Sequence, residues 1–193
     1  ATLAGLSGNT YAANTAFQIS GALSTNQVMN IVDGVNKYTL TSTLTINSGS
    51  TLTVASGVQV QNNYNGTALA VNGTLNATGA SFVTGSYVPN IRVSSGGTAN
   101  LTNCNLAAGS LTYNTGSTGT INGGTIAGDL NLSGGTPTVT GVNFTNPTSI
   151  RVTPDALATL AGLSGNTYAA NTAFQISGTL STNQVMNIVD GVS

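Results

Sequence analysis

The stretch Ala77-Thr-Gly-Ala-Ser-Phe82 carries a pattern that returns along the chain: an apolar residue, a small polar residue, Gly or Asn, two variable residues, and an apolar or aromatic residue. Four further copies are Leu101-Thr-Asn-Cys-Asn-Leu106, Ile121-Asn-Gly-Gly-Thr-Ile126, Val139-Thr-Gly-Val-Asn-Phe144 and Leu163-Ser-Gly-Asn-Thr-Tyr168. Their starts are separated by 24, 20, 18 and 24 residues. Short apolar runs at a near-fixed period are typical of a coil whose turns stack on one another.

A period of about 22 residues predicts an all-β protein folded as a three-faced parallel β-helix, or β-solenoid. The whole chain would make roughly eight to nine such turns. Because stacked strands lie about 4.8 Å apart, a unit of seven turns would rise about 34 Å. The competing architecture is a β-sandwich of hairpins, which rarely repeats one motif at such regular spacing.

Stacking the motif copies predicts two ladders of inward side chains, in which like residues pack on like residues along the axis. The first ladder is Ala77, Leu101, Ile121, Val139 and Leu163, and the second is Phe82, Leu106, Ile126, Phe144 and Tyr168. Between them lie Gly79, Asn103, Gly123, Gly141 and Gly165. These residues tolerate a positive φ, so we predict a corner of the coil at this position.

A second, longer repeat divides the chain. Residues 158–192 match residues 1–35 at 34 of 35 positions, and the single difference replaces Ala22 by Thr179. Residues 1–157 therefore form one full unit of continuous solenoid, and residues 158–193 begin the next. This organisation predicts a parent molecule built as a tandem array of units.

The composition excludes several classes of function. Charged residues make up 4% of the chain, and Lys37, Arg92 and Arg151 are its only cations. Nucleic-acid binding needs several Lys or Arg to neutralise phosphates, so we expect no nucleic-acid partner. No apolar run approaches the roughly 20 residues of a membrane-spanning helix, so we expect no membrane span.

Two segments resemble a known group of proteins. Leu69-Ala-Val-Asn-Gly-Thr-Leu-Asn-Ala-Thr-Gly-Ala-Ser-Phe82 and Ile91-Arg-Val-Ser-Ser-Gly-Gly-Thr-Ala-Asn-Leu-Thr-Asn-Cys104 are similar to the right-handed parallel β-helix repeats of bacterial secreted and cell-surface proteins. That group includes adhesin stalks and pectate-lyase-like folds, and the resemblance covers most of residues 38–150. It implies a right-handed coil in an extracellular or surface-attached bacterial protein. Because this fold carries both enzymes and inert fibres, the resemblance implies little about activity.

An inventory of reactive groups argues against an enzyme. The resemblance implies that an enzyme with this fold would use a cluster of Asp residues, often with Ca²⁺. The only acids of this chain are Asp33, Asp129, Asp155 and Asp190. Glycoside hydrolysis needs two carboxyl groups across one bond, and the chain has no Asp-x-Asp pair and no His. Asp129, Arg151 and Asp155 are placed to face one another on adjacent turns. We interpret them as a cross-turn ion pair on a wet face, with an Asp/Arg catalytic or Ca²⁺ site as the alternative. We expect no cofactor and no metal.

Cys104 is the only cysteine and would stack on Ala80 and Gly124, both small. We expect a buried or corner thiol rather than a nucleophile, because no base is available to activate it.

Threonine-rich strands raise the possibility of ice binding, since a flat array of Thr side chains can match an ice lattice. The Thr-x-Thr steps are Thr39-Leu-Thr41, Thr43-Leu-Thr45, Thr51-Leu-Thr53 and Thr138-Val-Thr140. These steps do not recur at one phase of each turn, and Thr is in any case a favourable residue for an exposed strand. The sequence therefore predicts no regular ice-binding plane.

The leading functional hypothesis is a non-enzymatic structural protein of an extracellular filament, stalk or cell-surface layer. Its units would stack end to end, and its partner would be a second copy of itself, end to end or side by side. Scarce charge removes much of the repulsion that keeps proteins apart, and residues 1–20 contain neither charge nor Pro to block an open strand edge. The alternatives are an adhesin whose lateral faces bind glycans or other surfaces, a polysaccharide-active enzyme, and an ice-binding solenoid.

Overall fold

A computed structural model describes residues 6–146, 149–186 and 189–190. Parallel strands coil about one axis into a solenoid of about seven turns, with about 22 residues in each turn. The predicted all-β parallel solenoid is confirmed. The expected eight to nine turns are not confirmed, because residues 177–186 form no strand after the last complete turn.

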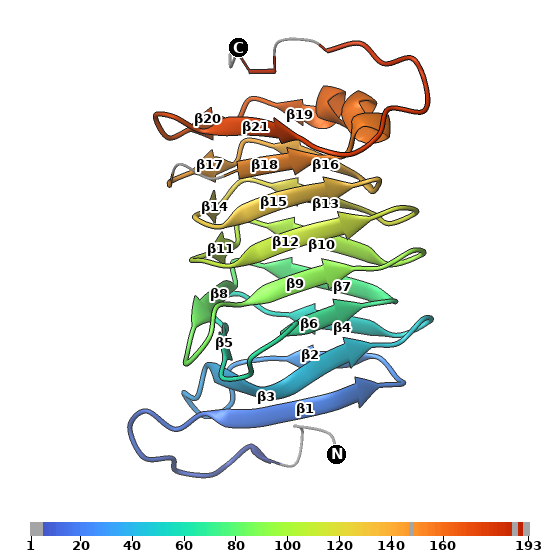
Figure 1. Ribbon diagram of the computed structural model, residues 1–193. Coiled ribbons are helices and arrows are strands. Elements are labelled where there is room, and N and C mark those ends of the chain that lie inside the picture. The colour runs from blue at the N-terminus through green and yellow to red at the C-terminus, as the bar shows by residue number, and fades with distance from the viewer. Residues whose placement is uncertain (1–5, 147–148, 187–188, 191–193) are drawn as a thin grey trace.

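Every turn contributes one strand to each of three faces (Figure 1). The first face contains β5 (Gln59–Asn62), β8 (Ser81–Thr84), β11 (Asn105–Leu106), β14 (Thr125–Ile126), β17 (Asn143–Phe144) and β20 (Thr167–Tyr168). The second contains β6 (Leu69–Val71), β9 (Asn90–Val93), β12 (Ser110–Asn114), β15 (Asp129–Ser133), β18 (Ser149–Val152) and β21 (Ala173–Ile176). The third contains β2 (Gln27–Met29), β4 (Thr51–Val54), β7 (Thr74–Thr78), β10 (Thr98–Thr102), β13 (Thr118–Asn122), β16 (Thr136–Thr140) and β19 (Leu163–Ser164).

The N-terminal end of the solenoid is built by two longer strands. β3 (Lys37–Ile46) bends across two faces: its first residues pair with β5, and its last residues pair with β6. β1 (Phe17–Leu23) lies along the whole of β3, so that Phe17 is opposite Tyr38 and Leu23 is opposite Ile46. β1 and β2 therefore form the outermost turn at this end (Figure 1).

The two ladders expected from the motif run along the core. Neighbouring strands place Ala77, Leu101, Ile121, Val139 and Leu163 opposite one another on the third face. Phe82, Leu106, Ile126, Phe144 and Tyr168 stack in the same way on the first face, and all but Tyr168 are fully buried. The corner positions Gly79, Asn103, Gly123, Gly141 and Gly165 have φ values between 51° and 66°. Two further ladders on the second face lie outside the motif: one runs from Leu44 to Ile150, the other from Ile46 to Val152.

One insertion interrupts the coil. The 3₁₀ helix η2 (Pro154–Gly162) lies between β18 and β19 and buries Ala156, Leu157 and Leu160. None of the helices among the described residues is long and apolar enough to span a membrane.

Candidate functional site

The outward positions of the third face form a regular array. In β4, β7, β10, β13 and β16, every second side chain points into the core and the others point to solvent. The outward residues are 11 Thr and 3 Asn: Thr51, Thr53, Thr74, Asn76, Thr78, Thr98, Asn100, Thr102, Thr118, Thr120, Asn122, Thr136, Thr138 and Thr140. Among them, Thr51, Thr74, Thr98, Thr118 and Thr136 fall in a single column.

Single Thr residues recur at one phase of the turn, although the Thr-x-Thr steps do not. The corners absorb the variation in turn length, so the strands themselves stay in register. The Thr-x-Thr steps alone do not reveal the array, because Asn76 and Asn100 replace Thr in two turns. A signal was available: a Thr stands three residues before the first motif position in four of the five motif copies, whereas Leu160 stands there in the fifth.

Hydrogen bonds between turns hold the array in place. Asn100 Nδ2 donates to Asn76 Oδ1 at 2.9 Å, and Thr120 Oγ1 donates to Asn100 Oδ1 at 3.2 Å. The hydroxyls of Thr98 and Thr118 lie 3.2 Å apart. Small polar side chains thus link successive turns without charge, which accounts for much of the unusual composition.

The structure brings two of the three predicted charged residues together. Arg151 Nη1 lies 2.5 Å from Asp129 Oδ2 on the second face, and its Nε donates to Gln175 Oε1 at 3.2 Å. The side chains are 48% and 31% exposed, so water screens the pair and its contribution to stability is small. Asp155 is not part of this pair: it accepts hydrogen bonds from Ser181 and Thr182, because η2 carries it away from β15.

Replacing Arg151 by Gln is expected to lower the free energy of unfolding by less than about 1 kcal/mol, because an exposed ion pair is weak. Urea unfolding followed by circular dichroism at low and high salt checks this, since salt should reduce the difference further. Asp129→Asn is the matched change and should give a loss of similar size. A loss above about 3 kcal/mol would contradict the screened-pair interpretation and indicate a buried ionic site.

Asp155 holds the segment that follows β21. It accepts from the amides of Ser181 and Thr182 at 3.0 and 3.2 Å and from both of their hydroxyls. The bonds from Ser181, and then those from Thr182, lower the pKa of the Asp155 carboxyl. A carboxyl with a lowered pKa is charged and able to accept these bonds at neutral pH.

Protection of the Ser181 and Thr182 amides is expected to depend on pH through Asp155. The contribution is complete above the ordinary Asp pKa of about 4 and is lost as pH falls through the lower folded value. Amide hydrogen exchange by NMR should show this loss in the unaltered chain, and Asp155→Asn should show weak protection at every pH. Asp129→Asn is the control, and an unchanged profile in Asp155→Asn would contradict the assignment.

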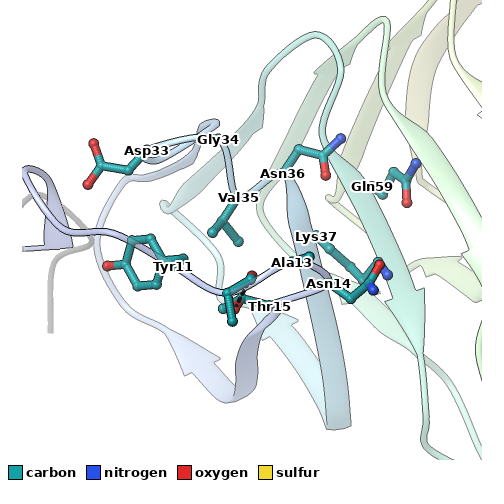
Figure 2. A pocket seen from close by; sticks show the side chains of 11 residues that line it. Tyr11, Ala13, Asn14, Thr15, Asp33, Gly34, Val35, Asn36, Lys37 and Gln59 are labelled. Atoms are coloured by element: carbon teal, nitrogen blue, oxygen red, sulfur yellow. Dashed lines mark hydrogen bonds between the residues drawn. The ribbon is translucent and has the colours of Figure 1, made fainter.

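A polar hollow of about 490 Å³ opens beside the N-terminal turn (Figure 2). Tyr11, Asn14, Asp33, Lys37 and Gln59 line it with hydroxyl, amide, carboxylate and ammonium groups. Asp33 Oδ2 accepts from the Asn9 amide at 2.8 Å, and Figure 2 shows its carboxylate directed away from Lys37. The hollow can offer hydrogen bonds to a small polar ligand, but it does not contain the two carboxyl groups that glycoside hydrolysis requires.

Cys104, the remaining reactive residue that the sequence singles out, is buried in the core. Cys104 is 7% exposed and lies against the backbone of Ala80 and Gly124, and burial raises the pKa of its thiol. Within residues 6–146, 149–186 and 189–190, no group of three His, Cys, Asp or Glu side chains is placed to hold a metal ion.

The two copies of the long repeat share the conformation of one short segment, residues 11–17 and 168–174. Asn14 and Asn171 both have φ of 66°, and Thr15 and Thr172 donate to the carbonyls of Ala12 and Ala169 at 2.8 and 2.9 Å. The ring of Phe17 meets Tyr11 edge-on, as the ring of Phe174 meets Tyr168, at centroid distances of 5.7 and 6.0 Å.

The copies differ in what covers them. Met29 is 2% exposed because β4 lies over it, with Met29 opposite Val54. Its counterpart Met186 is 68% exposed, and the neighbouring Leu180 and Val185 are 56% and 73% exposed. Residues 17–29 are thus covered on one side by β3 and β4, whereas residues 180–186 at the other end of the solenoid are largely exposed (Figure 1).

Comparison with known proteins found no matching family model, no matching curated protein and no matching solved structure. The parallel solenoid is therefore established by its own strand pairing. The comparisons give no support to the likeness to bacterial adhesin and pectate-lyase-like repeats.

Proposed function

We propose that this chain is a non-enzymatic structural protein of an extracellular filament, stalk or cell-surface layer, in which solenoid units stack end to end. The observation that carries the proposal is the state of the two end turns. Solenoids normally stop at a capping turn with a polar outer face, and sheet edges are normally blocked by charge or Pro. The strands β1, β2, β19, β20 and β21 contain neither charge nor Pro.

Apolar side chains are exposed beside both end turns. Val28 and Ile31 are 47% and 49% exposed at one end, and Leu180, Val185 and Met186 are more exposed at the other. Burying such residues against a further turn is favourable by about 25 cal/mol per Å² of apolar surface. A secreted or surface-attached bacterial origin, which the repeat resemblance implies, belongs to the same proposal.

Electron microscopy in negative stain tests the filament directly. The purified chain, concentrated at neutral pH, should form uniform rods one solenoid wide whose length grows with concentration. Their axial repeat should be about 34 Å, because seven turns rise about 4.8 Å each. Short particles of one size at every concentration would contradict the proposal.

The regular threonine array favours ice binding as a second candidate function. Outward side chains repeat about every 4.8 Å along the axis and about every 6.6 Å across it, on a face without charged or aromatic side chains at its 14 outward positions. A ligand that matches such an array is itself ordered in two dimensions and uncharged. Ice meets both conditions, whereas surfaces that bind sugar chains usually supply aromatic rings.

Thermal hysteresis and the shaping of ice crystals test this second candidate. Thr120→Lys places a long charged side chain in the middle of the third face and should abolish both effects. Thr112→Lys makes the same change on an outward position of the second face and should preserve them. Absence of hysteresis in the unaltered chain, or an equal loss in both variants, would contradict ice binding.

A further inference from the structure

The first copy of the long repeat shows what covers the second. Within the chain, residues 17–29 are covered by the turn formed by β3 and β4, with Phe17 opposite Tyr38, Leu23 opposite Ile46 and Met29 opposite Val54. Residues 174–186 have the same sequence except at Thr179, which replaces the exposed Ala22. The side chains that pack against β3 and β4 in the first copy are therefore present in the second.

We propose that chains join by exchange of this repeat: residues 163–186 of one chain take the place of residues 6–29 of a second copy, beneath its β3 and β4. The inference rests on the proposed end-to-end assembly and gives that assembly a register. Phe174 would lie opposite Tyr38, Leu180 opposite Ile46, and Met186 opposite Val54 of the second copy.

The exchange costs little in contacts, since the segment that arrives makes the same contacts as the segment that leaves. The displaced residues 6–29 regain the conformational freedom that they lost on folding, and this gain opposes the entropy lost when two molecules associate. The arriving segment becomes covered on both sides, because β18 already lies under Phe174 and Ile176. Exchange thus removes the exposed surface of Leu180, Val185 and Met186.

The junction also sets a rotation between units. Phe17–Ile19 underlie Tyr38–Leu40, from which the first face continues through β5. Phe174–Ile176 instead rest on Ile150–Val152 of the second face. Joining the copies therefore continues the second face of one unit into the first face of the next. Successive units should be related by about one third of a turn about the axis.

A matched pair of variants tests the exchange. Phe174→Ala removes a side chain that packs at the junction and should raise the concentration needed for half-maximal assembly about tenfold or more. Phe17→Ala loosens the segment that has to leave, so it should lower that concentration. Joining of intact ends without exchange predicts that both variants weaken assembly. Circular dichroism of the dilute chains checks that each variant keeps its β structure.

Disulfide trapping tests the register. In chains with Cys104→Ala, Thr179→Cys in one chain should form a disulfide with Thr45→Cys in another, because Thr45 lies opposite Ala22 in the covered copy. Ala70→Cys lies in the same column one turn further in and should not react. If intact ends join without exchange, the second repeat of one chain meets the first repeat of the next. Thr179→Cys should then form its disulfide with Ala22→Cys of the other chain.

The outcomes separate the two proposals. Trapping at Thr45 and opposite effects of the two Phe variants support exchange. Trapping at Ala22, or equal weakening by both variants, overturns exchange and leaves the filament standing. Trapped pairs that form no filaments would support exchange and contradict the filament. If the chains neither form trapped pairs nor assemble, both proposals are contradicted.

Discussion

Replacing Gly119 by Val is expected to lower the free energy of unfolding by about 3–5 kcal/mol, because the site combines overpacking with backbone strain. Gly119 lies in the middle of β13, between Ala99 of β10 and Pro137 of β16. A Cβ atom there would lie 1.9 Å from the carbonyl oxygen of Ala99, which is backbone and cannot move aside. Its φ of +153° also disfavours any side chain.

Urea unfolding followed by circular dichroism measures this loss. The dependence of the unfolding free energy on urea concentration should fall if the turns on either side of β13 separate and unfold independently. Thr120→Val is the control: Thr120 is the outward neighbour of Gly119 in the same strand, and the loss of its exposed hydrogen bond to Asn100 should cost no more than about 1 kcal/mol. Gly119→Ala should already be costly, since the clash begins at Cβ. Equal midpoints for Gly119→Val and Thr120→Val would contradict the close approach of these turns.

Part of the core could be predicted from the sequence, because each copy of the short motif contains two inward residues, one at its start and one at its end. The step from Leu101 to Leu106 spans a strand end, a corner and the start of the next face, so its spacing is fixed by local geometry. Asn103, with φ of 51°, marks that corner. The ladders on the second face could not be predicted, because loops of varying length separate their residues from the motif.

Interactions between distant turns could not be predicted in the same way. The spacing along the chain predicts that Asp155 lies near Asp129, but η2 directs Asp155 toward Ser181 instead. The long repeat makes the point more strongly, since Phe17 and Phe174 share their sequence and local conformation and still stack in different columns. Which face a strand joins is decided by the turn against which it packs, and a repeat contains no information about that neighbour.

Truncating Tyr113 is the second change with a large expected effect. Its side chain is fully buried on the second face and crosses the core, where its hydroxyl donates to the carbonyl of Ala99 at 2.9 Å. The small residues Ala99 and Gly119 leave room for the ring on the opposite wall. Tyr113→Ala should therefore cost about 3–5 kcal/mol through the cavity that it leaves. Tyr113→Phe keeps the ring, loses one hydrogen bond, and should cost about 1 kcal/mol.

Alkaline unfolding separates the hydroxyl of Tyr113 from its ring. Burial raises the pKa of Tyr113, so the folded state keeps the phenol neutral. In the unfolded state the phenol ionises near pH 10, so its contribution to stability is complete below about pH 10 and is lost as pH rises toward the folded value. Urea midpoints between about pH 8 and pH 11 should fall less steeply in Tyr113→Phe than in the unaltered chain. Tyr87→Phe, which replaces a tyrosine that is 44% exposed, is the control variant. Equal slopes in Tyr113→Phe and Tyr87→Phe would contradict a neutral phenol buried between the second and third faces.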